Sequence, residues 1–130
     1  MKKILSILSM MLVALVVASC SQNSPEGVVK NYYTLIGEGK YDEAVELLHF
    51  KKEKTAEEKQ QFADMMREKA ANDLDKRGGI TSIDITKVEM AEDGKSANVS
   101  AKITYGNGDD KIQDNKVVNV DGDWKVDSGK

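Results

Sequence analysis

Apolar and polar residues alternate without a break between residues 96 and 105, SANVSAKITY. The apolar half of this pattern comprises Ala97, Val99, Ala101, Ile103 and Tyr105. The residues between them are Ser96, Asn98, Ser100, Lys102 and Thr104. Because successive side chains of a strand point to opposite faces, the pattern predicts a strand with one buried and one wet face. Such a strand is typical of an antiparallel sheet.

The residues before Ile80 follow the helical period instead. Ser24 and Pro25 predict the start of a first helix, because serine is a favoured N-cap and proline suits the first helical position. Gly37 is expected to end this helix in the left-handed conformation. A second, short helix is expected over residues 41–48, where apolar residues recur at helical spacing.

A third helix is predicted to begin at Thr55, which forms a capping box with Glu58. Gly78 and Gly79 are expected to end it, after a last turn rich in Lys and Arg. Its remaining faces are charged, so we expect the helix to lie on the domain's surface. The apolar residues assigned to its inner side are Phe62, Met65, Met66, Ala70 and Leu74.

Four strands are expected after residue 80. The pairs Ile83/Ile85 and Val88/Met90 alternate in opposite phase, which predicts a bulge near Thr86. Further strands are expected over residues 111–120 and around 124–126, with hairpin turns between them. The chain is therefore predicted to be an α+β domain, with three N-terminal helices packed on a curved four-stranded antiparallel sheet.

The N-terminus has the three parts of a secretory signal peptide. Lys2 and Lys3 precede an apolar run over residues 4–18, and small residues lead into Cys20. The run is too short for a permanent span, because fifteen helical residues cover only about 22 Å of a roughly 30 Å hydrocarbon core. Cys20 is the only cysteine, so no internal disulfide is possible in the exported chain.

The net charge of the exported chain limits the kinds of partner that it can bind. Without Lys2 and Lys3, 17 of the 19 basic residues remain against 22 acidic ones. This mildly acidic balance argues against binding to nucleic acid or to anionic lipid headgroups through charge. We therefore expect no nucleic-acid partner, and membrane attachment would have to come from acyl chains.

Val17-Ala18-Ser19-Cys20 resembles the lipobox of bacterial lipoproteins, in which lipoprotein signal peptidase cuts before a lipidated cysteine. The alternative is an ordinary secreted protein with a cysteine near its cut. The resemblance implies a lipoprotein signal peptide over residues 1–19, a lipidated polar tether over 20–24, expected to be mobile, and a single domain over 25–127. Ser21, where aspartate would imply inner-membrane retention, points to the outer membrane. The absence of an acidic run after Cys20 favours the periplasmic face.

Two further segments carry a resemblance to a domain family. These are Pro25-Glu26-Gly27-Val28-Val29 with Tyr32-Tyr33, continued by Gly39-Lys40-Tyr41, and the closing Asp121-Gly122-Asp123-Trp124-Lys125-Val126. They resemble the opening and the terminal hairpin of nuclear-transport-factor-2-like domains. The chain is most similar to small bacterial lipoproteins of unknown function, described as cystatin-like or lumazine-binding-like. The resemblance implies the cone-shaped fold of that superfamily and leaves the function open.

Candidate site residues are few. His49 is the only histidine, and it is interpreted as a surface or capping residue because no acid is close to it in sequence. The aromatic candidates for lining a pocket are Tyr32, Tyr33, Tyr105 and Trp124, but they fit core positions with their polar tips reaching water better. The Asp-Gly and Asn-Gly segments fit tight turns better than a calcium loop. No cofactor, metal or catalytic residue is predicted.

The sequence therefore favours a non-enzymatic, membrane-anchored periplasmic lipoprotein. Its partners would be the lipid bilayer, through acylated Cys20, and an envelope protein or a small ligand. Two alternatives stay open. One is a dehydratase- or isomerase-like enzyme with an internal pocket, and the other is a cystatin-like inhibitor or immunity protein acting through loops such as 106–110.

Overall fold

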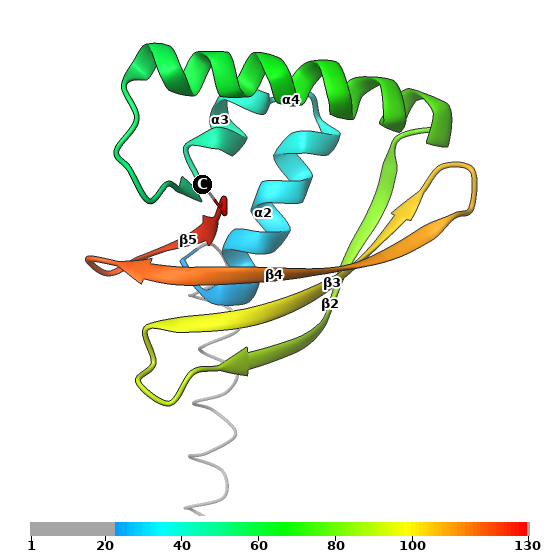
Figure 1. The fold of residues 1–130 in the computed structure, drawn as a ribbon. Coiled ribbons are helices and arrows are strands. Elements are labelled where there is room, and N and C mark those ends of the chain that lie inside the picture. The colour runs from blue at the N-terminus through cyan, green and yellow to red at the C-terminus, as the bar shows by residue number, and fades with distance from the viewer. Residues whose placement is uncertain (1–22, 130) are drawn as a thin grey trace, which may run out of the picture.

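The computed structural model describes residues 23–129, which form an α+β domain of helices over a curved sheet (Figure 1). The helices are α2 (Pro25–Gly37), α3 (Tyr41–Val45) and α4 (Ala56–Arg77). The strands are β1 (Leu48–His49), β2 (Ile80–Met90), β3 (Ser96–Tyr105), β4 (Asp110–Val120) and β5 (Asp123–Asp127). None of the helices in this part of the chain is long and apolar enough to cross a membrane.

The prediction of a four-stranded antiparallel sheet is wrong in one respect. The sheet is mixed and has five strands in the order β1-β5-β4-β3-β2. The extra strand is β1, in which Leu48 and His49 pair in parallel with Val126 and Asp127. The second helix ends at Val45, earlier than expected, and strand β1 follows it at Leu48. Two residues are too few for a period to show in the sequence, and the pairing partner lies far along the chain.

Most helix boundaries follow the predicted capping residues. The Ser24 hydroxyl accepts a hydrogen bond from Gly27 N at 3.0 Å, and Thr55 forms the expected capping box with Glu58. Gly78, with φ of 83°, ends α4. The first helix differs from the prediction, because the left-handed residue after α2 is Gly39, with φ of 78°.

The sheet has one inner face, covered by the helices, and one outer face. On β3 the predicted alternation is confirmed, with Ala97, Val99 and Ala101 buried. The register between β2 and β3 shifts between Ile85 and Lys87, which confirms the predicted bulge. Directly paired residues of an antiparallel sheet share a face, so the inner face continues across β4 through the partners of these inward β3 residues.

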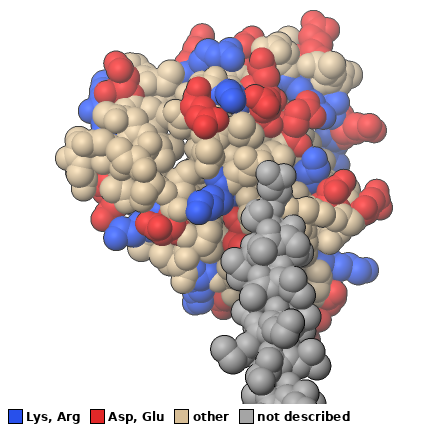
Figure 2. Space-filling model, turned by 180° about the vertical axis from the view of Figure 1, so that it is seen from behind, with Lys and Arg blue, Asp and Glu red and all other residues tan. Residues whose placement is uncertain are grey.

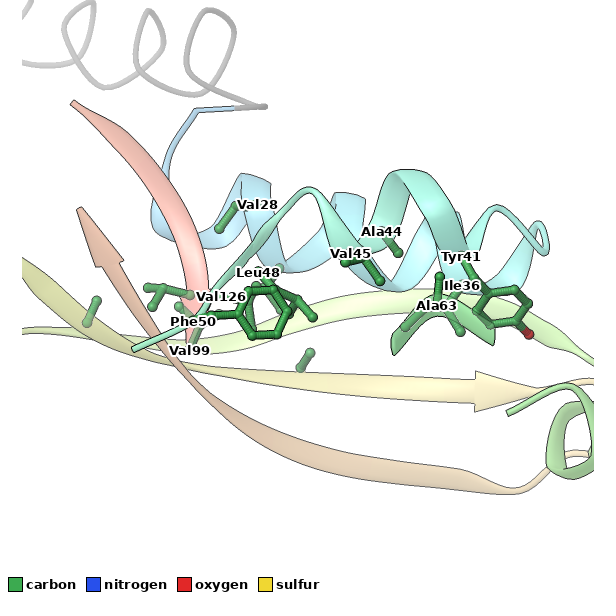
Figure 3. Close-up of a cluster of buried hydrophobic side chains, with 14 residues drawn as sticks. Val28, Ile36, Tyr41, Ala44, Val45, Leu48, Phe50, Ala63, Val99 and Val126 are labelled. Carbon is green, nitrogen blue, oxygen red and sulfur yellow. The ribbon is translucent and has the colours of Figure 1, made fainter. Parts of the chain in front are cut away.

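The core lies between α2, α3 and the inner face of the sheet (Figure 3). Val28 and Val45 of the helices meet Val99, Val117 and the other inward residues of the strands, and these side chains are buried almost completely. Burying a valine of this kind contributes roughly 1.5–3 kcal/mol relative to exposure. This layer holds α2 in a fixed position across the sheet.

Helix α4 lies over α3, on the outside of the molecule (Figure 1). As predicted, it is mostly exposed, and Ala63 is its one buried residue. Phe62, at its start, meets Phe50 edge to face, with ring centroids 5.2 Å apart. Met65 does not join the inner side and is 38% exposed, because it lies off the stripe that Phe62 and Met66 continue.

The described chain begins beside the β4–β5 turn. Asn23 Nδ2 donates to Gly122 O at 3.1 Å, and Trp124 N donates to Asn23 Oδ1 at 3.1 Å. Ser24 is buried. These two residues, which the sequence placed in a mobile tether, are thus held against the domain. The predicted signal peptide and Cys20 lie outside the described residues.

Candidate functional site

A groove of about 320 Å³ runs between α2 and the start of β2. Its size is at the small end of the range for ligand sites. From α2 and its C-terminal cap the lining residues are Lys30, Tyr33, Thr34, Gly37 and Glu38. From β2 they are Ile80, Thr81, Ser82 and Ile83. The groove thus has apolar residues at one wall and charged residues on the helix side.

Helix α2 and strand β2 approach each other closely where Gly37 and Ile80 line the groove. A Cβ added to Gly37 would lie 3.3 Å from Ile80 Cβ, so the absence of a side chain lets Ile80 pack directly on the helix. β2 is also the last strand in the sheet order, so nothing in the described part of the sheet pairs with its far edge. The groove therefore runs beside an open strand edge.

Tyr33 is the aromatic residue of the groove, and its hydroxyl is fixed in position. It donates to Asn115 Oδ1 at 2.8 Å. The amide of Asn115 is oriented in turn, because its Nδ2 donates to Gln113 O at 3.2 Å and to Val99 O at 3.4 Å. Burial raises the pKa of Tyr33, the bond to Asn115 partly offsets this, and Tyr105 adds to the rise. The phenol is therefore neutral at physiological pH.

Tyr32 packs edge to face against Tyr33, with ring centroids 5.2 Å apart and an interplanar angle of 70°. Burial, with a smaller effect from Tyr33, raises the pKa of Tyr32 to about 12. Tyr105 is buried beneath the Arg77 guanidinium, which lies 5.0 Å from the ring centroid. Trp124 is half-buried on β5 beside Asn23. Of the four aromatic candidates, only Tyr33 lines this groove.

Asn115, the partner of Tyr33, was not among the candidates from the sequence. It lies on β4 two residues before buried Val117 and is paired with Val99, so it faces inward. A polar residue at an inward position of a strand is the signal that could have identified it, because such groups need hydrogen-bond partners. Tyr33, 82 residues earlier in the chain, could not have been assigned to it.

A second depression, of about 350 Å³, surrounds His49 and Phe50. Its lysines mostly interact within the protein. Lys125 donates to Glu46 O at 2.8 Å, and Lys59 pairs with Glu46 Oε2 at 3.5 Å. Within residues 23–129, no carboxylate forms an ion pair with His49. On the face seen in Figure 2, basic and acidic side chains are likewise interspersed, with neither sign gathered into a patch.

The Asn-Gly-Asp segment of the β3–β4 turn is held by turn chemistry. Asp109 N donates to Asn107 Oδ1 at 2.9 Å, and Asn107 Nδ2 donates to Asp109 Oδ2 at 3.0 Å. In the part of the chain that the structure describes, no three His, Cys, Asp or Glu side chains are grouped as metal ligands.

The helices lie across the inner face of a curved sheet (Figure 1), and a solved structure shares this NTF2-like fold. A crystal structure from Campylobacter jejuni, with the provisional name NTF2-like transpeptidase, aligns with a TM-score of 0.67 and 20% identity. The alignment covers 80% of this chain and 97% of that one. The chain belongs to the family described as a domain of unknown function, DUF4878, whose model matches residues 18–127.

The intermembrane space region of the chloroplast protein ARC6 aligns less well. Its TM-score is 0.40 at 15% identity, over 79% of this chain and 89% of that one, too low to support an argument. No curated protein matches the sequence. The comparisons thus confirm the predicted NTF2-like fold and place the chain in a family of unknown function.

Proposed function

We propose that the protein is a lipid-anchored lipoprotein of the bacterial envelope, held in the outer membrane and facing the periplasm. Its domain binds a small ligand or a segment of an envelope protein in the groove between α2 and β2, without catalysing a reaction. The observation that carries the binding role is the hydrogen bond from the Tyr33 hydroxyl to Asn115.

This pair is suited to recognition. An amide does not titrate, and the raised pKa of Tyr33 keeps the phenol protonated well above neutral pH. General acid–base catalysis works best with a group whose pKa lies near the working pH. A fixed, neutral hydroxyl beside the apolar side chains of Ile80 and Ile83 instead suits a ligand with an apolar body and one polar group.

Support for the anchor comes from the sequence. Lys2 and Lys3, the apolar run over 4–18 and the small residues before Cys20 together fit export and lipidation. One acyl chain would give only marginal attachment, whereas the several chains of a lipoprotein cysteine hold a protein firmly. Ser21 supports the outer membrane.

The anchor is tested by mass spectrometry of the protein purified from membranes. We expect an acylated N-terminal Cys20 in the parent protein and no acyl mass in Cys20→Ala. Ser19→Ala is the matched control, because it keeps a small residue before the cysteine and should remain acylated. An unmodified Cys20 in the parent protein would overturn the lipoprotein assignment.

The groove is tested by photo-crosslinking in cells. A crosslinking residue at Ser82, on the groove wall, should give a defined adduct, whereas one at Asn98, exposed on the outer face, should not. Tyr33→Phe should weaken the adduct. Equal adducts from both positions would contradict a role for the groove. Release of a chemically altered ligand by the purified protein would favour the dehydratase- or isomerase-like alternative instead.

A further inference from the structure

The side chain of Asn23 clamps the beginning of the domain to its end. Its amide both donates to Gly122 O and accepts from Trp124 N, each at 3.1 Å, as a neighbouring strand would. A primary amide can do this because it carries a donor and an acceptor side by side. The next residue, Ser24, caps α2 and is buried. The chain is therefore fixed in place from Asn23 onward.

Very little chain separates this clamp from Cys20. The three steps from residue 20 to residue 23 span at most about 11 Å when fully extended. Strand β3, with ten residues, is about 33 Å long. The domain is thus longer than the connection, so an anchor at Cys20 keeps the Asn23 end of the domain within about 11 Å of the membrane.

We infer that the domain stands end-on on the bilayer, with the β4–β5 and β2–β3 turns at the lipid surface and the Tyr33 groove at the far end. This rests on the proposed lipidation of Cys20. We call residues 91–95 and 121–123, together with Asn23, the membrane-proximal end. Its two turns lie at the same end of the sheet, because Asn119 N donates to Lys95 O at 2.8 Å.

The groove extends from the middle of α2 toward the opposite end of the same elements. Gly37 and Glu38 are at the C-terminal end of α2, whereas Asn23 precedes its first turn. Ile80 begins β2, whereas the β2–β3 turn follows its last residue. In Figure 1 the β4–β5 turn is at the left and the start of β2 is at the right. In this orientation the groove lies away from the bilayer, where a partner in the periplasm can reach it.

The charge of the membrane-proximal end does not attract it to the bilayer. The exposed acidic residues of the two turns are Glu92, Asp93, Asp121 and Asp123, against the single base Lys95. Anionic headgroups would repel such a surface, so the turns supply no attraction of their own. The acyl chains therefore provide the attachment, and the clamp at Asn23 provides the orientation.

The test uses the full acylated protein in phosphatidylcholine vesicles that carry a nitroxide on some headgroups. Because Cys20 is acylated and no other cysteine exists, an introduced cysteine gives a single labelling site. A fluorophore at Glu92→Cys reports on the membrane-proximal end, and one at Glu38→Cys reports on the rim of the groove. Both positions are exposed, so labelling should not disturb the fold.

We expect the nitroxide to quench the label at residue 92 several-fold more than the label at residue 38. Trp124, the only tryptophan, should be quenched as well, since it lies beside the clamp. Asn23→Ala should reduce the difference between the two labels while the acyl mass and the helix content stay unchanged.

Equal quenching at both positions in a protein that carries the acyl mass would overturn the end-on orientation and leave the lipoprotein assignment standing. Stronger quenching at residue 38 would overturn it as well. Absence of the acyl mass, measured independently of quenching, would overturn the assignment and the orientation together.

Discussion

The partly buried phenol of Tyr32 should make the protein lose stability in alkaline solution, and the Tyr32→Phe variant should lose less. Burial raises the pKa of Tyr32 from 10.0 to about 12 in the folded protein. A difference of about two units corresponds to roughly 2.7 kcal/mol between the two protonation states. Tyr33 shifts in the same direction for the same reason, so it adds to the effect.

The sign follows from which state loses its proton first. Below pH 10 both states hold the phenol proton, and the stabilisation is fully present. As the pH rises from 10 toward 12, the unfolded chain releases protons that the folded protein retains, so the free energy of unfolding falls. Each such tyrosine contributes a slope of up to about 1.4 kcal/mol per pH unit.

The assay is urea unfolding of the chain from Ser21 onward, without the anchor, at several pH values between 9 and 11. Tyr32→Phe should have a shallower decline of unfolding free energy with pH, by up to the slope of one tyrosine. Lysines titrate equally in both proteins, so the difference in slope isolates residue 32. Identical slopes would show that the Tyr32 hydroxyl is solvated and that its burial is misread.

Four further substitutions, one of them a control, test other parts of the structure by urea unfolding. Gly106→Ala would place a Cβ against the backbone of Gly78 at the end of α4, so it should lower the free energy of unfolding by about 3 kcal/mol. The control is Gly94→Ala, which has open space around it and φ of 69° and should cost only about 1–2 kcal/mol. Equal losses of unfolding free energy in the two variants would contradict the close approach of Gly106 to Gly78. Thr55→Ala should cost about 1 kcal/mol, and the pKa of Glu58, lowered by its bonds to Thr55, should rise toward its ordinary value in an NMR titration. Val99→Ala should cost about 2 kcal/mol, because Val99 is fully buried, and a loss below 0.5 kcal/mol would place it outside the core.

The parts of the fold that could be predicted are those with local causes. Ser24 and Thr55 cap their helices through bonds to residues three positions away, and the bulge near Thr86 changes the phase of neighbouring residues. In the same way, the alternation of polar and apolar residues along β3 identifies its solvent-facing side without knowledge of what packs on its inner side. Each of these patterns is complete within a few residues.

The parts that could not be predicted depend on distant residues. β1 is a strand because Leu48 pairs with Val126, and two residues are too few to show a strand pattern in the sequence. The candidate site has the same difficulty. Tyr33 stood out as an aromatic residue, but its role in the groove is defined by Asn115 on a strand 82 residues away. The sequence could therefore name one half of the pair and not the other.

The bond between Asn23 and Trp124 joins residues 101 positions apart, and it has a consequence for folding and stability. β5 is the last strand in the chain, yet β1, β4 and the residue before the first helical cap all bond to it. Contacts of such long range carry a large loop-closure entropy, which slows folding. A nascent or truncated chain that lacks residues 123–127 should therefore be less stable than the whole domain, because β1 loses its pairing partner and Val126 is missing from the core.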